Sequence, residues 1–592
     1  MIFLNAVETK ADPLSVSTLF GLPKAVRSFC NSCEQTGAVT RQEKEFWSSY
    51  NKPTTNFIVW GVRAVVEPNQ LIVINDAGYP TADTTMRYSM EPSGYVPQSR
   101  YLDIHENGDW LGLIPADKNG NFVLGRGGAK FDPNKPHSAE LVLNTGSASE
   151  IKSGPVSLPV GQIQILSDDG TDTPMLGAVT DDVTTLKLRL TVKNGWQTLT
   201  NLNWKIADPQ VPDASDAIKG TLLDGNNPVD TLPVSFNSNG VATATYEVPE
   251  TFVRFGTTQE TLDRGLAERQ VQITLNGQEV KSPAIRLKRP PVVLVHGLWG
   301  TPDGTWSGFK PIVNGDSGKY FIHRADYSIG DYSNSGSLAQ NYPVIEEAIS
   351  LALDETNSAG FAVTKVDVVT HSMGGLVTRE YCRREPVACA GAIRKLITID
   401  TPHLGSELAT QWIGLVRPFA HHKAVLKAIG FTDDGAFDVL KPDSPSLAEL
   451  QNQVLPVPMF KIAGRTPDND YGYGSIYALW DTLKERFSLV PDESFETQIH
   501  LEFWNWKTAR YETSLYFYTP VFRILNDAAF LGRNDRIVSV RSQINGNIEN
   551  SRIIDNSDHF TVTKSQSPVQ SCVKQLLDAK ITAAGTIPAC DL

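Results

Sequence analysis

The feature that most constrains this chain is a mostly apolar run that ends in a serine-centred turn. Residues 366–369 are followed by Thr370-His371-Ser372-Met373-Gly374-Gly375, and a helical pattern comes next. This order predicts a buried strand, a tight turn and a helix, in which backbone strain exposes the Ser372 hydroxyl above the sheet. The turn needs small residues two positions on either side of the serine. Gly374 meets this need, whereas Thr370 stands where glycine is commonest.

A second apolar strand supplies a matching feature upstream. Residues 290–295 lead into His296-Gly297-Leu298, where the glycine lets the chain turn inward. A developing oxyanion needs two backbone N–H donors that the fold already holds in place. The N–H groups of Leu298 and Met373 are the donors that this pattern predicts.

An acidic residue and a histidine follow the serine in the order that a proton relay needs. Asp535 lies in a loop before an apolar segment, and His559 lies in a polar loop before a helix. A serine hydroxyl stays protonated near neutral pH, so it needs a base beside it. We expect His559 to take the proton of Ser372, and Asp535 to hold the imidazole in the required tautomer. The order serine, acid, histidine is that of α/β-hydrolases.

Residues 288–592 resemble the bacterial lipase and esterase branch of the α/β-hydrolase superfamily, close to its PGAP1-like and class 2 lipase groups. The stretches that carry the resemblance are residues 296–298, 325–328, 370–375, 401–406 and 535–538. The resemblance implies a mostly parallel sheet with helical cap insertions at about 406–457 and 466–530. It also implies the same triad and the same oxyanion hole that the motifs predict.

The acid of this triad has a competitor. Asp400 ends the apolar strand 395–400, and some lipases carry their acid at that position. An unusually long excursion, residues 465–532, precedes Asp535. Asp400 therefore stays open as the alternative acid.

The other histidines and acidic loops do not predict a metal site. We expect His371 to point away from the serine and pack, and His403 to fix its own loop. His421-His422 has no Cys, Asp or Glu cluster nearby and is expected to be solvated in the cap. Residues 117–121 imitate a calcium loop, but glycine occupies the twelfth position, where a carboxylate is required, so we expect a hairpin turn. Residues 168–172 are expected to form a solvated loop.

The first half of the chain has a different pattern. Short alternating runs separated by Gly, Pro, Asn and Asp, such as residues 185–192, predict antiparallel hairpins. We expect a mixed segment over 1–54, a β-rich module over 55–150 and an Ig-like β-sandwich over 151–287. The chain is thus predicted to be multidomain, with all-β modules before an α/β-hydrolase domain at 288–592. These modules are expected to bind a surface, a glycan or a protein, or to act as a spacer.

Composition narrows the range of partners and compartments. The chain of 592 residues has a net charge of −13 and no Lys/Arg-rich stripe, which argues against binding to nucleic acids or anionic membranes. No apolar window reaches the roughly 18 residues of a membrane helix. Three close cysteine pairs, Cys30/Cys33, Cys382/Cys389 and Cys572/Cys590, favour disulfides and a secreted or cell-envelope location. Residues 1–8 lack the features of a signal peptide, so the location stays open.

These features together predict a serine carboxylic-ester hydrolase that works through an acyl-enzyme and needs no cofactor. An apolar helical stripe in the first insertion and many aromatic residues in the second predict a covered pocket. Such a pocket favours a small-molecule or lipid ester with an apolar acyl chain, and transient contact with a lipid interface. The alternatives are a phospholipase or acyltransferase of the same fold, and a surface-binding protein with a hydrolase-like domain.

Overall fold

A computed structural model of the chain describes part of its 592 residues. The longer described ranges are 71–80, 100–116, 129–143, 155–275, 278–309, 318–411, 432–466, 537–559 and 568–582. The shorter ones are 2–6, 35–38, 41–44, 49–52, 55–61, 64–66, 85–89, 121–123, 151–152, 413, 499–505, 510–515, 534–535, 561–563, 587–588 and 590.

Several predictions from the sequence lie outside these ranges. They are the Cys30/Cys33 pair, the His421-His422 pair, most of the loop 117–121, and the larger part of both predicted cap insertions. Within the second insertion, the described strands β31 (Ile499–Asn505) and β32 (Arg510–Leu515) pair antiparallel.

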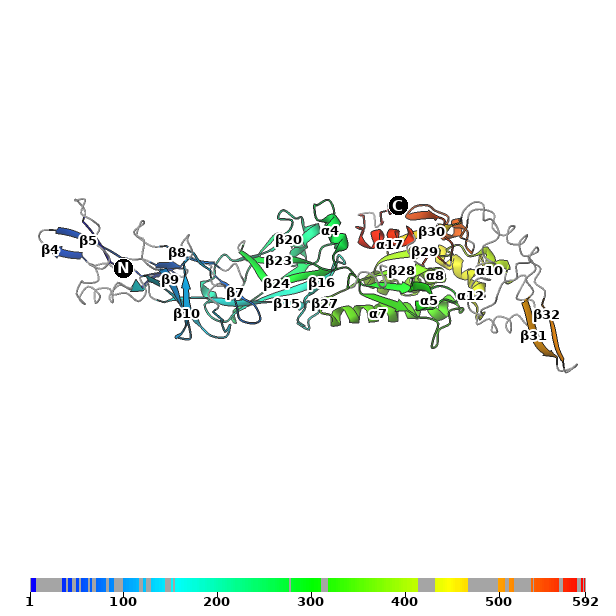
Figure 1. The fold of residues 1–592 in the computed structure, drawn as a ribbon, viewed down its shortest axis with the longest axis horizontal. Coiled ribbons are helices and arrows are strands. Elements are labelled where there is room, and N and C mark those ends of the chain that lie inside the picture. Colours follow the sequence, from blue (N-terminus) through cyan, green and yellow to red (C-terminus); the bar gives the residue numbers. More distant parts are fainter. Residues whose placement is uncertain are drawn as a thin grey trace. The chain divides into compact units, whose positions relative to one another are not determined.

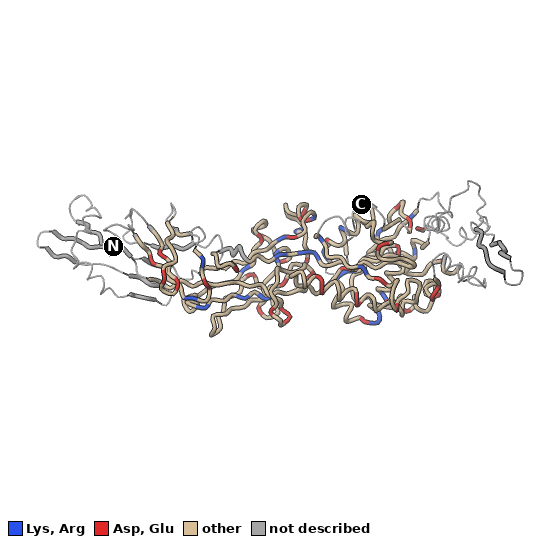
Figure 2. Tube along the Cα trace, turned by 60° about the horizontal axis from the view of Figure 1, so that its bottom comes forward, with Lys and Arg blue, Asp and Glu red and all other residues tan. Residues whose placement is uncertain are grey.

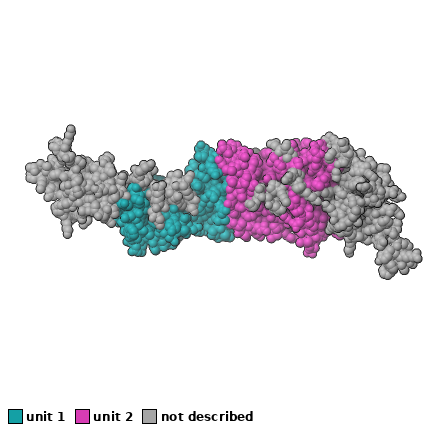
Figure 3. Space-filling view, viewed as in Figure 1, with its two compact units in different colours: residues 1–178, 185–249, 269–287 teal, residues 179–184, 250–268, 288–592 magenta. Residues whose placement is uncertain are grey.

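The chain divides into two compact units (Figure 3). The first contains residues 1–178, 185–249 and 269–287. The second contains residues 288–592 together with two earlier segments, 179–184 and 250–268. Each unit is described below by itself.

The first unit is built from β-sheets. One sheet has the strand order β20 (Asn227–Val229), β19 (Thr221–Asp224), β22 (Val241–Glu247), β17 (Thr185–Val192), β15 (Val160–Ser167) and β7 (Ile72–Ile74). A second contains the path β21 (Thr231–Pro233), β18 (Asn203–Ala207), β23 (Arg269–Leu275), β24 (Gln278–Lys288) and β16 (Gly177–Val179). Buried and part-buried residues alternate along β17, as the period of two in the sequence predicts.

A further sheet of the first unit lies earlier in the sequence. It pairs β9 (Arg100–Glu106) with β10 (Asp109–Pro115) on one side and β12 (His137–Leu143) on the other, all antiparallel. Leu102, Ile104 and Leu141 from these strands are buried in one hydrophobic cluster. These three strands lie within residues 55–150, the range of the predicted β-rich module.

The second unit is a parallel sheet with helices on both faces (Figure 1). Its strand order is β26 (Ile322–Ala325), β25 (Val292–Val295), β28 (Val366–His371), β29 (Ile393–Ile399), β30 (Met459–Arg465) and β33 (Ser551–Asp555). Every neighbouring pair is parallel. All residues of β25, β28 and β29 are buried, as expected for parallel strands that are covered on both faces.

Two hydrophobic clusters fill the two sides of this sheet. On one side, α7 (Pro343–Ser358) and α8 (Met373–Arg384) pack against residues such as Val293 and Val368. On the other, α17 (Pro568–Asp578) packs against residues such as Leu294 and Val369. Because side chains alternate along a strand, neighbouring residues of β25 and β28 serve opposite faces. The α/β-hydrolase architecture predicted for this part of the chain is confirmed.

The remaining helices of this unit are shorter. They are α5 (Pro302–Trp306), α6 (Leu338–Asn341), α9 (Pro386–Ala392), α10 (Glu407–Gln411), α12 (Ala436–Leu440), α13 (Pro445–Gln451) and α16 (Val540–Gln543). Among the described residues, no helix is both long and apolar enough to cross a membrane.

Polar contacts bind residues 179–184 and 250–268 to the rest of the second unit. One carboxylate oxygen of Asp181 accepts from the backbone N–H groups of Thr364 and Lys365, at 2.9 Å each. Arg289 donates to the carbonyl oxygen of Asp263 at 3.0 Å and to the carboxylate of Asp578 at 2.7 Å. Basic and acidic residues are interspersed along the described chain (Figure 2).

Two disulfides join cysteines of the second unit. They link Cys382 with Cys389 and Cys572 with Cys590, as the close spacing in the sequence predicts. The first joins α8 to α9, and the second ties α17 to the C-terminal residues that follow it.

Candidate active site

Ser372 occupies the turn between β28 and α8. Its backbone has φ 53° and ψ −128°, a conformation that is strained for a residue with a side chain. Such strain is typical of residues that the surrounding structure holds in place for a function. A Cβ atom at Gly374 would lie only 2.4 Å from the carbonyl oxygen of His296, so this position requires glycine. Thr370, the departure from the usual glycine, is fully buried at the end of β28.

Ser372, His559 and Asp535 form one hydrogen-bonded chain. The Nε2 atom of His559 lies 2.9 Å from Oγ of Ser372, and its Nδ1 atom lies 2.7 Å from Oδ2 of Asp535. All three residues are buried, with Ser372 the most exposed at 7%. The structure therefore brings together three residues that are up to 187 positions apart in the sequence.

The loop around Asp535 is fixed by its own backbone. Oδ1 of Asp535 accepts from the N–H groups of Ile537 at 2.9 Å and Val538 at 2.6 Å. The N–H of His559 donates to the carbonyl oxygen of Asp535 at 3.0 Å. Two backbone N–H groups thus donate to the carboxylate, and Asp535 and His559 are joined through both side chain and main chain.

The residues that follow β25 pass directly beside Ser372. A Cβ atom at Gly297 would lie 2.6 Å from Cβ of Ser372, so only glycine allows the two segments to approach this closely. Within the described structure, neither Leu298 nor Met373 uses its N–H in a hydrogen bond to the protein. They are the two N–H groups that the sequence predicts as oxyanion donors.

Residues that the sequence motifs did not indicate hold the segment after Gly297. Trp299 adopts a left-handed backbone conformation with φ 55°, and its N–H donates to the carbonyl oxygen of Asn334 at 3.0 Å. The side chain of Asn334 donates in return to the carbonyl oxygen of Gly300 at 2.9 Å. The Trp299 indole N–H donates to the carbonyl oxygen of Thr432 at 2.8 Å. Asn334 has no sequence signal of its own, because its partners are backbone atoms.

Asp400, the alternative acid, follows β29 and is fully buried, with φ 50°. Its Oδ1 accepts from the N–H of Gly464 at 2.6 Å, and no donor among the described residues reaches its Oδ2. Burial, reinforced by the charge of Asp535, raises the pKa of the Asp400 carboxyl well above its usual range. The imidazole of His559 is bonded to Asp535 and not to Asp400.

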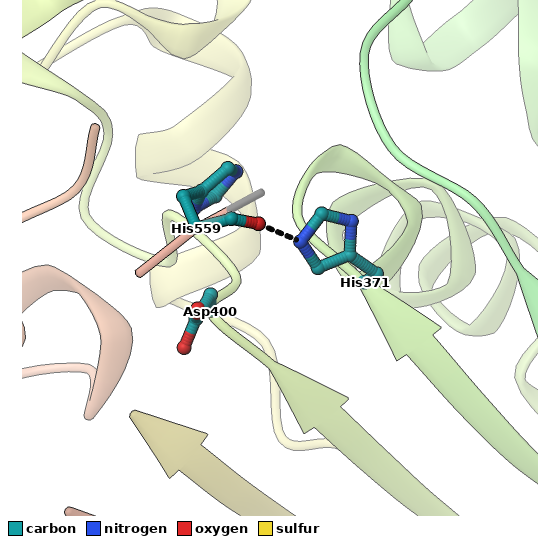
Figure 4. Close-up of side chains that lie close together, drawn as sticks. All are labelled: His371, Asp400 and His559. Carbon is teal, nitrogen blue, oxygen red and sulfur yellow. Dashed lines mark hydrogen bonds between the residues drawn. The ribbon is translucent and has the colours of Figure 1, made fainter. Parts of the chain in front are cut away.

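The two histidines nearest the nucleophile in sequence have different surroundings. The ring of His371 faces His559: its Nε2 lies 2.9 Å from the main-chain carbonyl oxygen of that residue (Figure 4). His371 is buried and packs against His559, as expected, and the contact with this carbonyl oxygen is one that the sequence does not indicate. His403 does fix its loop, since Nδ1 lies 2.9 Å from Arg379 and Nε2 lies 3.1 Å from the hydroxyl of Thr398. Burial lowers the pKa of both rings well below the usual value.

His371, Asp400 and His559 also form the kind of cluster that could hold a metal ion. One ligand atom from each lies within 4.8 Å of the others. Both ring nitrogens of His559 are already bonded to Ser372 and Asp535, and Nε2 of His371 is bonded to a carbonyl oxygen. The donor set therefore fits a proton relay better than a metal site.

Comparison with known proteins agrees with this architecture. Residues 317–427, which include Ser372 and Asp400, match the family described as PGAP1-like alpha/beta domain. The resemblance to PGAP1-like lipases and esterases is confirmed. The chain is 29% identical over 126 residues to triacylglycerol lipases of Pseudarthrobacter phenanthrenivorans and Burkholderia plantarii. These matches cover 20% of this chain and 35% and 32% of the two relatives, so the chain spans about a third of their length.

Solved structures of similar proteins are more distant. The lipase BlEst2 of Bacillus licheniformis in its mature form is 17% identical, with a TM-score of 0.29. That match covers 47% of this chain and 87% of the lipase. A similarity at this level carries no weight for the function of the chain.

Proposed function

We propose that the chain is a serine carboxylic-ester hydrolase in which Ser372, His559 and Asp535 form the catalytic triad. The observation that supports this most directly is the continuous path from Oγ of Ser372 through the imidazole to Asp535, at 2.9 Å and 2.7 Å. These are the distances at which a base can take a proton from a hydroxyl.

In the proposed mechanism, Oγ of Ser372 attacks the carbonyl carbon of an ester while Nε2 of His559 takes the hydroxyl proton. The negative charge that develops on the carbonyl oxygen is stabilised by the N–H groups of Leu298 and Met373. Collapse of this intermediate breaks the bond to the alcohol, which receives the proton from His559 and leaves an acyl-enzyme. Water then attacks the acyl group by the same route in reverse and restores Ser372.

Asp535 has two tasks in this cycle. Its bond to Nδ1 selects the tautomer in which Nε2 is free to accept a proton, and its negative charge stabilises the imidazolium that forms. Its own position is fixed by the N–H groups of Ile537 and Val538. Protein groups alone therefore supply every step, and the mechanism requires no cofactor.

The proposed substrate is a lipid ester or a small-molecule ester with an apolar acyl chain. Support comes from the two curated relatives, which are named triacylglycerol lipases. Contact with a lipid interface would be transient. Residues 55–150 and 151–287 are proposed as separate β modules of the chain, the second Ig-like, that bind a surface, a glycan or a protein.

The test is hydrolysis of p-nitrophenyl esters by the wild-type chain, Ser372→Ala and a control variant, Ser307→Ala. Ser307 is an exposed serine at the end of α5 in the same unit. We expect Ser372→Ala to lose at least about 10³-fold in kcat and Ser307→Ala to match the wild type. A fluorophosphonate should label only the peptide that contains Ser372. Normal turnover by Ser372→Ala would refute the proposal.

A panel of esters of increasing acyl length, with phospholipids beside them, separates the alternatives. Preferred release of fatty acid from phospholipids would indicate a phospholipase. Formation of a new ester in the presence of added alcohol would indicate an acyltransferase, because the acyl-enzyme can pass its acyl group to an alcohol as well as to water.

A further inference from the structure

The relay lies beside two buried carboxyl groups that have different environments. Asp535 receives two backbone N–H donors and the imidazole of His559. Asp400 receives one N–H donor, that of Gly464, and no donor among the described residues reaches its second oxygen; a side-chain hydrogen bond with the carboxyl group of Asp535 also raises its pKa. No ion pair of the described residues involves Asp400. When two nearby carboxyl groups have environments this different, they usually differ in protonation as well.

We propose that Asp400 is a positioning residue for the relay. As a neutral carboxylic acid it binds the end of β30, and the end of β30 in turn binds the loops that carry Asp535 and His559. This inference rests on the proposed function, because it concerns the same relay.

The contacts at the end of β30 connect Asp400 to both loops. The N–H of Gly464 donates to Asp400, and the next residue, Arg465, accepts from the N–H of Ser557 at 3.1 Å. Thr466 then donates its N–H to the carbonyl oxygen of Asn534 at 3.0 Å. Ser557 and Asn534 lie two residues and one residue before His559 and Asp535. Three consecutive residues of one strand end therefore hold Asp400, the base loop and the acid loop.

The fit around Gly464 leaves little room for adjustment. A Cβ atom at this position would lie 2.9 Å from Oδ2 of Asp400 and 3.0 Å from the carbonyl oxygen of Ser557. The glycine thus allows the carboxyl group and the base loop to approach the same backbone point. A displacement of the carboxyl group would therefore displace Ser557, and with it His559.

The neutral form of Asp400 follows from the groups that face it. The titratable groups nearby are Asp535, His371 and His559, and Asp558 also acts on it. Burial, then the negative charge of Asp535, raises the pKa of Asp400, and the N–H of Gly464 only partly opposes this. A second negative charge beside Asp535 would be costly in this buried place. A neutral acid avoids it.

The experiment compares Asp400→Asn, Asp400→Ala and Gly464→Ala with the wild type, with Asp354→Asn on the exposed face of α7 as the control. Asparagine keeps the neutral, hydrogen-bonding shape. We expect Asp400→Asn to retain kcat within about threefold, and both alanine variants to lose about ten- to hundredfold in kcat with little change in KM. Circular dichroism checks that each variant is folded.

The pH profile of kcat/KM separates positioning from a charge effect. If Asp400 is neutral, Asp400→Asn should leave the acid limb of the profile within about 0.3 pH units of the wild type. A downward shift of about one unit or more would show that a negative charge beside His559 has been removed, and would overturn the proposal. The pH profile therefore tests the neutral state of Asp400 even if the alanine variants fail to fold.

Ser372→Ala serves as the blank. Substantial turnover by Ser372→Ala would refute the proposed function itself. Wild-type kcat in a folded Asp400→Ala, with Ser372→Ala inactive, would refute only the positioning role of Asp400.

Discussion

The Nε2 atom of His371 lies 2.9 Å from the main-chain carbonyl oxygen of His559 (Figure 4). The residue that immediately precedes Ser372 therefore holds the loop that carries His559. Because burial keeps the pKa of His371 well below its usual value, the ring is neutral and its N–H donates to this carbonyl oxygen. We expect His371→Leu, which removes the donor, to lower kcat by about ten- to hundredfold, since small displacements of a catalytic group are costly.

Steady-state ester hydrolysis by His371→Leu, His371→Gln and His323→Gln tests this role. Glutamine at position 371 offers an N–H donor and should recover part of the activity. His323 lies in β26 of the same sheet and serves as the matched control. Equal activity of the leucine variant and the wild type would show that the bond to His559 is not needed.

Replacing Asp535 by asparagine should have a larger effect. The amide cannot stabilise the imidazolium, and it can donate to Nδ1 and so favour the wrong tautomer of His559. By analogy with serine hydrolases in general, we expect kcat to fall by about 10³- to 10⁴-fold while the fold is retained. The parallel variant Asp400→Asn should keep most of its activity. If instead Asp400→Asn lost more activity than Asp535→Asn, the roles of the two carboxyl groups would have to be exchanged.

Ser372, His559 and the parallel sheet could be predicted from the sequence because their signals are local. Ser372 lies in a short strand–turn–helix pattern. His559 lies in a polar loop and comes last in the order serine, acid, histidine that is typical of α/β-hydrolases. The choice between Asp535 and Asp400 could not be made in the same way. Both carboxyl groups come close to His559, and only the three-dimensional path of the loop after β30 determines which one bonds to Nδ1.

Two other features depend on contacts that leave no local trace. His371 was expected to pack because alternation around the turn points it away from Ser372, yet a loop 188 residues later brings a carbonyl oxygen to its ring. The segments 179–184 and 250–268 belong to the same compact unit as residues 288–592 although they precede it in sequence. Their anchors, such as Asp181 with two backbone N–H groups, are ordinary polar residues in the sequence.

Gly297→Ala should damage the site, whereas Gly391→Ala should not. A Cβ atom at Gly297 would lie 2.6 Å from Cβ of Ser372, so the strand end that carries the Leu298 N–H would be pushed away. We expect a loss of about 10²-fold in kcat, comparable with the loss of one oxyanion donor, and about 1–3 kcal/mol of destabilisation. A Cβ atom at Gly391 in α9 meets nothing within 4 Å, and alanine there should stabilise the helix by about 0.5–1 kcal/mol. Kinetics and thermal unfolding of both variants check this contrast.

The disulfide between Cys572 and Cys590 should contribute to the stability of the second unit. It closes a loop with a sequence separation of 18, and both cysteines are buried in the cluster that contains α17. In the chain-entropy description, a loop of this size corresponds to about 3 kcal/mol, and the Cys382–Cys389 loop, with a separation of 7, to about 2 kcal/mol. Thermal unfolding of the two double-alanine variants should therefore show the larger loss for the Cys572/Cys590 pair. The reverse order would mean that native-state contacts outweigh loop closure.

The raised pKa of Asp400 also makes a prediction about stability. An aspartate in the unfolded chain titrates near pH 3.9. In the folded protein burial, and then the charge of Asp535, raises the pKa of Asp400 well above that value. Between these two pKa values the folded protein holds a proton that the unfolded chain has released. The contribution of Asp400 to stability therefore falls as pH rises, by up to about 1.4 kcal/mol per pH unit.

Asp400→Asn has no such proton to lose, so its stability relative to the wild type should increase as the pH rises above about 3.9, the value for the unfolded chain. Urea unfolding of both proteins, followed by tryptophan fluorescence at several pH values from about pH 5 upward, measures the difference directly. Asp354→Asn should show a difference from the wild type that does not change with pH, because Asp354 is exposed on α7. A pH-independent difference for Asp400→Asn as well would mean that Asp400 is already ionised at about pH 5. Contacts other than the N–H of Gly464 would then have to stabilise a second buried negative charge.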